Sequence, residues 1–175
     1  MRLDDDDFTL FGLAPRQALD RDDLDTRWRQ LQGAAHPDRY AADGAAAQRI
    51  AMQWAVRINE AYQRLKDPVR RAAYLCERRG APIDAERNTA MPAAFLLQQM
   101  AWREALDEVG DATALQRLED EVVAHERGLL AELQSELDDR DAATAPTDAA
   151  RTVRALMFVN KFRRDLERRL DALPH

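Results

Sequence analysis

The sequence predicts an all-α protein that consists of an N-terminal helical hairpin with short helices and a C-terminal antiparallel three-helix bundle. Only six glycines and seven prolines occur among the 175 residues. Ala, Leu, Arg, Glu and Gln, which favour helix, are abundant, and β-branched residues are few. Apolar residues also recur every three or four positions along several long segments, which is the pattern of amphipathic helices that pack on a core.

Two helices are expected in the first 35 residues. A short helix near residues 8–13 follows four aspartates, which suit the positive end of a helix dipole, and Gly12 is a suitable stop. A second helix, capped by Asp20 or Asp22, is expected to run to about Ala35. Its apolar stripe consists of Leu24, Trp28, Leu31 and Ala35.

The turn His36-Pro37-Asp38 separates the second helix from the third. Proline fixes its own φ and disfavours helical backbone at the preceding residue, so His36 lies at or beyond a helix end. We expect a loop over residues 39–44 and a long helix over residues 45–66. Because the connection is short, the two helices form an antiparallel hairpin with His36 at its tip. The apolar stripe of the third helix consists of Ile50, Trp54, Ile58, Ala61 and Leu65.

The chain is expected to divide into an N-terminal domain at residues 1–79, a linker at 80–92 and a bundle at 93–175. The linker contains a glycine and two prolines, and a short helix over residues 70–79 precedes it. The bundle helices are expected at residues 93–109, 112–137 and 148–170, with a loop at 138–147.

The charge distribution argues against nucleic acid as a partner. The net charge is −6, of which residues 1–79 carry +1 and residues 80–175 carry −7, so no concentrated basic surface is expected. No apolar run approaches the length of a membrane span, and the aspartate-rich start is the reverse of a signal peptide. Cys76 is the sole cysteine, so neither a disulfide, a metal site nor a cofactor is expected. We therefore expect a soluble cytoplasmic protein.

His36 and Asp38 are presented side by side on a short exposed turn. No Ser or Cys nucleophile has a recognisable context nearby, and His125 and His175 are too widely separated in sequence to suggest a metal site. The pair therefore favours a contact with another protein over an active site, and no enzymatic activity is expected. A small hydrolase that uses His36 and Asp38 and a purely structural helical module remain as alternatives.

The helix over residues 93–109 carries more apolar side chains than its core face needs. At 100° per residue, one sector holds Phe95, Trp102, Leu106 and Val109. A different face holds Leu96, Leu97 and Met100 together with Glu104 and Glu108, and in the last helix Phe158 is rotated by about 100° from Val159. Three interpretations remain for this second face. The bundle-facing surface of the helix is simply wide, the face packs on the N-terminal half, or it forms an exposed apolar patch, rimmed by acid, that binds a protein.

Several segments resemble known co-chaperones. Residues 8–13 (FTLFGL), 36–40 (HPDRY) and 58–68 (INEAYQRLKDP) resemble a J-domain. More narrowly, residues 71–75 (RAAYL), 95–100 (FLLQQM) and 103–108 (REALDE) resemble the HscB family, which comprises J-type co-chaperones of iron–sulfur cluster assembly. The resemblance extends from about residue 8 to residue 170.

This resemblance implies a function with two partners. The J-domain would engage an ATP-bound DnaK-type chaperone (HscA) and accelerate its ATP hydrolysis. The residues implied in that contact are His36, Pro37, Asp38, Arg27, Arg29 and Arg39. The bundle would bind the scaffold protein IscU and deliver it as the client. The residues implied there are Leu96, Leu97, Met100, Glu104, Glu108 and Phe158, and an alternative is a different client at the same patch.

The sequence departs from the family pattern in several places, among them Arg39, which replaces the usual lysine after Asp38. Asp25, Gln30 and Ala34 occupy positions of the second helix where lysines are common, so the basic face that steers the chaperone contact is thin. This thin face leaves room for a dedicated chaperone partner. Gln98 and Ala101 stand where glutamates are frequent, so the acidic rim of the client face is reduced. The zinc-binding cysteines of some eukaryotic relatives are absent, which suits a bacterial-type protein.

Overall fold

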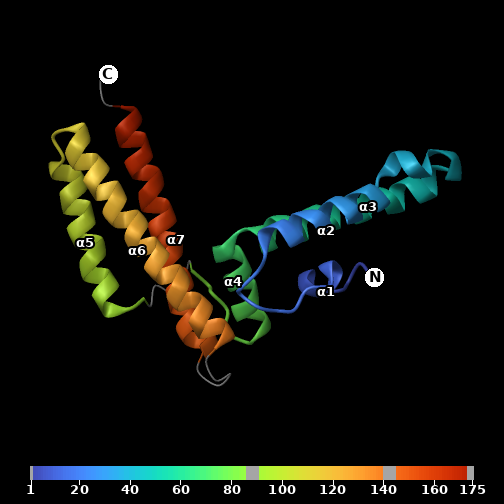
Figure 1. Cartoon of the computed structure of the whole chain (residues 1–175), viewed down its shortest axis with the longest axis horizontal. Helices are drawn as coiled ribbons and strands as arrows, with labels where there is room; N and C mark the ends of the chain where they lie inside the picture. Colours follow the sequence, from blue (N-terminus) through green and yellow to red (C-terminus); the bar gives the residue numbers. More distant parts are fainter. Residues whose placement is uncertain (1, 86–90, 140–144, 173–175) are drawn as a thin grey trace. The chain divides into compact units, whose positions relative to one another are not determined.

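The computed structural model describes residues 2–85, 91–139 and 145–172, and every regular element in those ranges is helical (Figure 1). The elements are α1 (Asp7–Phe11), α2 (Arg21–Ala34), the 3-10 helix η1 (Pro37–Asp43), α3 (Ala45–Lys66), α4 (Pro68–Arg78), α5 (Ala93–Glu108), α6 (Ala112–Asp138) and α7 (Ala145–Asp171). They form two compact units, Met1–Tyr74 and Leu75–His175. The division falls inside α4, whereas the sequence analysis placed a linker at residues 80–92.

Aspartate caps fix the starts of the first two helices. The Asp6 carboxylate accepts hydrogen bonds from the backbone N–H groups of Phe8 and Thr9, and Gly12 ends α1 with a left-handed φ of 64°. The Asp20 carboxylate likewise accepts from the first-turn N–H groups of α2. Both predicted helices are confirmed, and of the two candidate caps of α2 the structure selects Asp20.

Helices α2 and α3 form the predicted hairpin, in which they run side by side (Figure 1). Leu24, Ile58 and Leu65 are completely buried, because their positions on the two helical stripes face each other. Trp28 stacks on Tyr62 at 4.6 Å between ring centroids, and its indole Nε1 donates to Asn59 Oδ1 at 3.0 Å. An apolar seam and an aromatic pair therefore contribute to holding the hairpin together.

Three details of the first unit differ from the expectation. Residues 37–43 form η1 rather than an irregular loop, because Pro37 supplies a helical φ at its first position. Helix α4 begins at Pro68 rather than Arg70, because the Asp67 carboxylate accepts from the N–H groups of Val69 and Arg70. Ile50, predicted in the core stripe, is 52% exposed.

The second unit contains the three predicted bundle helices. Figure 1 shows α5 beside α6 and α6 beside α7. The fully buried side chains at its centre include Trp102, Leu115, Leu133, Leu156 and Leu166. Helix α7 begins at Ala145 instead of residue 148, with Pro146 in its first turn, where proline leaves no hydrogen bond unmade. The rest of the predicted loop, residues 140–144, lies outside the described residues.

The segment after α4 packs on the bundle rather than standing apart from it. Ile83 is 4% exposed, and its carbonyl oxygen accepts a hydrogen bond at 3.1 Å from Arg154 Nη1 of α7. Arg79 Nη1 donates to the Leu137 carbonyl at the end of α6 at 2.6 Å. The start of the predicted linker therefore belongs to the second unit, and residues 86–90 lie outside the described residues.

Candidate functional site

The His-Pro-Asp turn is built by the geometry of Pro37. His36 has extended backbone (φ −66°, ψ 126°), as expected for a residue before proline, and so becomes the N-cap of η1. Its Nδ1 atom accepts a hydrogen bond from the Asp38 backbone N–H at 3.3 Å, and its carbonyl accepts from Arg39 N at 3.0 Å. The imidazole is thereby fixed by its own turn rather than by a neighbouring helix.

The two residues after Asp38 tie this turn to the end of α2. The last carbonyl groups of an α-helix have no partner inside the helix. Here Arg39 Nη1 donates to Gly33 O and the Tyr40 hydroxyl donates to Ala34 O, each at 3.1 Å. Arg39, implied in the chaperone contact, therefore also holds the turn in place.

The side chains of His36 and Asp38 are both exposed at the tip of the hairpin. Their side chains are 57% and 90% exposed, and His36 Nδ1 lies 3.6 Å from Asp38 Oδ2. A general base needs a bound substrate within hydrogen-bond reach in a site that excludes water. The imidazole and the carboxylate at the open tip of the hairpin instead form an exposed polar surface.

The two arginines of α2 have different surroundings. Arg27 donates to both carboxylate oxygens of Asp23 at 2.9 Å and to the carbonyls of Phe11 and Gly12 at 3.0 and 3.2 Å. Arg29 is exposed and donates to the Asp25 carbonyl at 3.2 Å. Arg27 thus fastens the end of α1 to α2, and Arg29 is the more accessible cation of the two.

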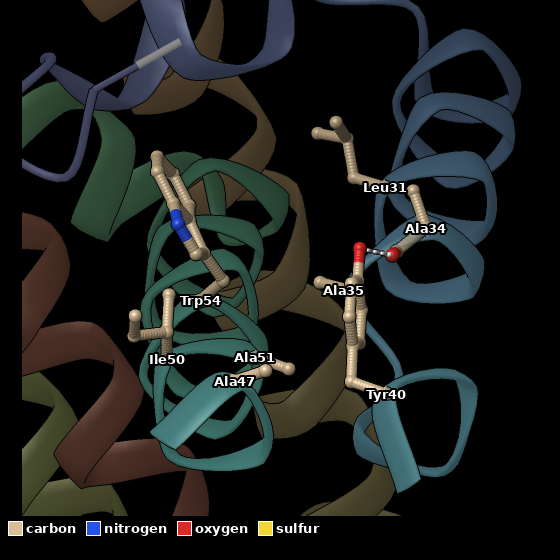
Figure 2. Close-up of a pocket in the computed structure, with 8 residues that line it drawn as sticks. All are labelled: Leu31, Ala34, Ala35, Tyr40, Ala47, Ile50, Ala51 and Trp54. Atoms are coloured by element: carbon tan, nitrogen blue, oxygen red, sulfur yellow. Dashed lines mark hydrogen bonds between the residues drawn. The ribbon is translucent and has the colours of Figure 1, made fainter. Parts of the chain in front are cut away.

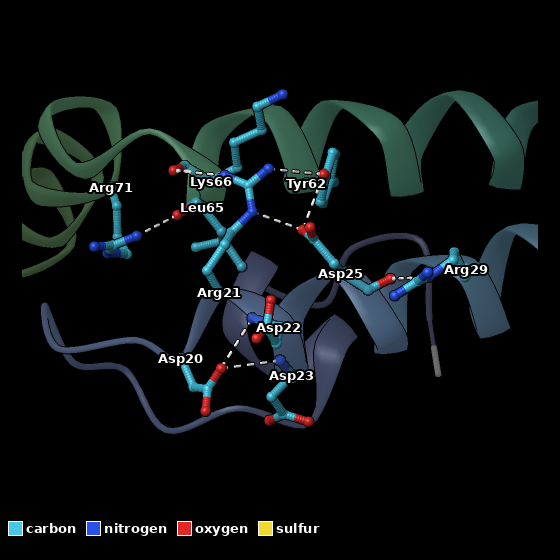
Figure 3. A network of polar contacts seen from close by, with 10 residues as sticks. All are labelled: Asp20, Arg21, Asp22, Asp23, Asp25, Arg29, Tyr62, Leu65, Lys66 and Arg71. Atoms are coloured by element: carbon cyan, nitrogen blue, oxygen red, sulfur yellow. Dashed lines mark hydrogen bonds and ion pairs between the residues drawn. The ribbon is translucent and has the colours of Figure 1, made fainter.

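A polar network at the base of the hairpin uses Asp25 (Figure 3). Arg21 Nε donates to Asp25 Oδ1 at 2.7 Å, and the Tyr62 hydroxyl donates to the same oxygen at 3.0 Å. Partial desolvation works to raise the pKa of Asp25, but these hydrogen bonds and the Arg21 charge outweigh it, so the pKa lies below its usual value. Asp25 is therefore ionised at neutral pH and offsets the charge of Arg21.

Helix α5 separates its two faces as the sequence predicts. Phe95 and Trp102 are buried, at 3% and 1% exposure, whereas Leu97 and Met100 are 71% and 68% exposed. Leu96 is also exposed, at 45%, as are Glu104 and Glu108. Within the second unit, this face is therefore an exposed apolar patch with an acidic rim. We call Leu96, Leu97, Met100, Glu104 and Glu108 the α5 face.

Phe158 differs from the other residues implied in client binding, because it is half-buried. Its ring meets Phe95 edge to face at 5.8 Å and stacks with Phe162 at 6.2 Å. The Arg103 guanidinium lies over the ring, 5.3 Å from its centroid. Phe158 is therefore part of the aromatic core of the bundle and joins α7 to the helix that carries the α5 face.

One feature of the hairpin tip is not among those predicted from the sequence. An open apolar pocket is lined there by Tyr40, Ile50, Trp54 and neighbouring small residues. The sequence does carry a signal for this pocket, namely small residues at seam positions of the hairpin where larger side chains would fill the space. These residues are Ala34, Ala35, Ala47 and Ala51.

Other classes of site lack support in the part of the chain that the structure describes. Residues 2–85, 91–139 and 145–172 contain no group of three or more His, Cys, Asp or Glu side chains suited to a metal ion. Within those ranges, no helix combines the length and apolar character needed to span a bilayer. Cys76 is buried, and this burial raises the pKa of its thiol to about 12, so it is not a ready nucleophile.

Comparison with known proteins identifies close relatives over nearly the whole chain. Residues 91–167 match the family model described as the HSCB C-terminal oligomerisation domain. The chain is 44% identical to a Co-chaperone protein HscB homolog of Cupriavidus taiwanensis, covering 98% of this chain and 97% of that one. It is 46% identical to the Burkholderia mallei homolog, covering 99% and 98%.

Two solved structures share the fold. The chaperone HscB from Vibrio cholerae is 36% identical, has a TM-score of 0.81, and is matched over 97% of this chain and 100% of its own. Human co-chaperone protein HscB is 21% identical with a TM-score of 0.89, over 99% of this chain and 86% of its own, which shows likeness of fold alone. The predicted all-α architecture is thereby confirmed, and the chain belongs to the HscB family of co-chaperones.

Proposed function

We propose that this chain stimulates ATP hydrolysis by a DnaK-type chaperone of the HscA kind and delivers to it an IscU-like iron–sulfur scaffold. Residues 1–79 would act as the J-domain, residues 93–175 as the client-binding domain, and residues 80–92 as their connection. The observation that carries the first half of the proposal is the exposed His36-Pro37-Asp38 turn, which Arg39 and Tyr40 fasten to the end of α2.

The α5 face carries the second half. It keeps Leu96, Leu97 and Met100 in solvent although the same helix buries Phe95 and Trp102. Exposed apolar residues of this kind, rimmed by carboxylates, are typical of a protein-binding surface. Phe158 supports this surface from within the bundle through its contact with Phe95. In the chaperone contact, Arg29 contributes an accessible cation.

Coupling the two activities needs no catalysis by this chain. Binding the scaffold and the chaperone to one polypeptide raises their effective concentration toward each other. We accordingly propose a cytoplasmic adaptor with no enzymatic activity of its own, no bound cofactor, and no nucleic acid or membrane partner. The acidic balance of residues 80–175 and the relatives' description as co-chaperones support this proposal.

The deciding experiment is single-turnover ATP hydrolysis by the cognate HscA-like chaperone. It is measured with this protein alone, with the scaffold alone, with both, and with His36→Gln in place of the wild type. We expect synergy between this protein and the scaffold, and its loss in the variant without loss of helical content. Stimulation without synergy would favour a different client at the α5 face, and absence of any stimulation would refute the proposed function.

A further inference from the structure

The hairpin tip holds an open pocket of about 350 Å³ that the stated function does not use. It lies between the end of α2, η1 and the start of α3 (Figure 2). Its lining consists of Leu31, Ala34, Ala35, Tyr40, Ala47, Ile50, Ala51 and Trp54. This volume is at the lower end of the range for ligand sites, about 300–1,000 Å³, so it suits a compact apolar group.

The pocket exists because the seam of the hairpin is underfilled at this end. Four of its eight lining residues are alanines, each of which contributes a single methyl group. Ile50 is consequently 52% exposed and Trp54 half-buried, although the helical period places both on the core stripe of α3. Toward the other end of the same hairpin, Ile58 and Leu65 on that stripe are completely buried.

The polar groups of the lining restrict what can occupy it. The Tyr40 hydroxyl is engaged by donating to Ala34 O at 3.1 Å (Figure 2). Indole N–H groups usually have an acceptor, and those of Trp28 and Trp102 donate to Asn59 and Glu121. Among the described residues, the Trp54 indole has no such acceptor in the fold. Apolar walls and one available donor match an apolar side chain carried on a peptide, whose backbone supplies carbonyl oxygens.

The pocket is continuous with the turn through which the chaperone is proposed to act. Ala35 directly precedes His36, and Tyr40 follows Arg39, so both chain segments that leave the turn enter the pocket lining. A partner that contacts Asp38 and His36 therefore extends over the pocket mouth. Binding energy at protein interfaces concentrates in such places, where one anchor side chain fills a pocket and is fully desolvated.

We propose that this pocket receives one large apolar side chain of the DnaK-type chaperone, inserted beside the His-Pro-Asp turn. This inference rests on the proposed function and deepens it. The anchor supplies apolar contact area where α2 offers little charge, since Arg27 is engaged with Asp23 and α1, and Asp25 offsets Arg21. A chaperone that lacks the matching side chain leaves water in the pocket and binds more weakly. This difference in affinity favours a dedicated chaperone partner.

The test fills the pocket from both walls. Ala47→Leu fills it from α3 and Ala34→Leu fills it from the end of α2. Ala45→Leu is the matched control, because Ala45 is exposed and lies two positions earlier, about 160° around α3 from Ala47. We expect each filled variant to keep its helical content and to need about tenfold or more protein for half-maximal stimulation of the chaperone ATPase, with the control at the wild-type value.

A second readout follows the pocket directly. The protein is labelled with 5-fluorotryptophan and observed by fluorine NMR, and the Trp54 resonance is assigned from its absence in Trp54→Phe. We expect this resonance to shift when the ATP-bound chaperone is added to wild type. In Ala47→Leu we expect it to remain unshifted. Unchanged half-maximal concentrations in both folded filled variants, with normal wild-type stimulation, overturn the pocket inference alone. A Trp54 shift that depends on this protein's own concentration assigns the pocket to a second copy and also overturns it. Absence of stimulation by the wild type removes the proposed function and this inference together.

Discussion

Asp7 is a buried carboxylate on which the attachment of α1 depends. It is completely buried, its two oxygens lie 2.8 Å from Arg57 Nη2 and Arg64 Nη1, and its backbone N–H donates to the Tyr74 hydroxyl at 3.1 Å. Arg57 also donates to the Asp5 carbonyl at 2.8 Å. Removal of one member of a buried ion pair is costly, because the remaining charges keep their desolvation without their partner.

We therefore expect Asp7→Asn to lower the free energy of unfolding by about 2–4 kcal/mol. This loss is smaller than for a fully buried ion pair, because Arg57 and Arg64 are both partly exposed. Urea denaturation followed by circular dichroism measures this. Asp4→Asn is the control, because Asp4 is exposed and, among the described residues, pairs only with the exposed Arg2, so a change within about 0.5 kcal/mol is expected. Equal effects of the two substitutions would contradict the structural role of Asp7.

Cys76 gives a prediction about pH. Burial, the largest cause, raises the pKa of its thiol from 9.0 to about 12, and nearby Arg79 opposes this while Glu136 adds to it. The folded state thus holds the proton more tightly than the unfolded chain. The associated stability is fully present below pH 9 and is lost as the pH rises toward 12. Between pH 8 and pH 10, wild type should lose more stability than Cys76→Ala, as measured by denaturant titration at each pH.

The same burial predicts low reactivity of the native thiol. The reference protein is the double variant Cys76→Ser/Ala101→Cys, whose single cysteine is exposed. At pH 9 we expect iodoacetamide to modify the buried Cys76 of wild type about two orders of magnitude or more slowly than this exposed cysteine. In denaturant, the two proteins should react at similar rates. Rapid modification of folded wild type would show that the segment around Cys76 opens readily.

At the scale of the element, α5 carries two functions on two faces. Its core face contributes Trp102, whose indole Nε1 donates to Glu121 Oε1 at 2.8 Å, and Phe95, which stacks on His125 at 5.5 Å. Its other face leaves Leu97 and Met100 in solvent. Substitutions on one helix should therefore separate stability from binding.

We expect Leu97→Ala to change the free energy of unfolding by less than about 0.5 kcal/mol and to weaken scaffold binding about fivefold or more. Phe158→Ala should weaken binding too, but with a loss of about 2 kcal/mol of stability, because its ring contacts Phe95 and Phe162. Calorimetric titration with the scaffold and thermal unfolding measure the two quantities. A Leu97→Ala variant as unstable as Phe158→Ala would show that the α5 face is covered in the native protein.

At the scale of the whole molecule, the proposed function requires both units in one chain. A chain that binds the scaffold but does not act on the chaperone should compete with the wild type. We expect excess His36→Gln protein to suppress the synergy of wild type when the scaffold is limiting, because it sequesters the scaffold. ATP hydrolysis by the chaperone at increasing amounts of the variant measures this.

The control is the double variant His36→Gln/Leu97→Asp, which places a charge in the α5 face and should not compete. Competition by the double variant at the same strength would mean that the scaffold is held elsewhere. Absence of competition by His36→Gln itself would mean that the turn and the client site are not separate in function.

The helices, and the faces of most of them, follow from local features of the amino-acid sequence. Helical periodicity, aspartate caps and the residues flanking proline act over a few positions, so α3 and the start of α6 could be predicted within one residue and the start of α2 within two. The same local geometry predicted that Leu97 and Met100 would be separated from Phe95 and Trp102, which the structure confirms.

Which residues meet across each seam, and therefore how well the seam is filled, depends on the tertiary fold. Ile50 and Trp54 fit the core period, yet they border a pocket because the opposing positions are alanines. Phe158, expected on a binding face, also belongs to an aromatic cluster, and Arg27, implied in the chaperone contact by the resemblance, also fastens α1 to α2. Periodicity gives the direction of a side chain, whereas burial depends on the volume and the polar groups that other elements bring to it.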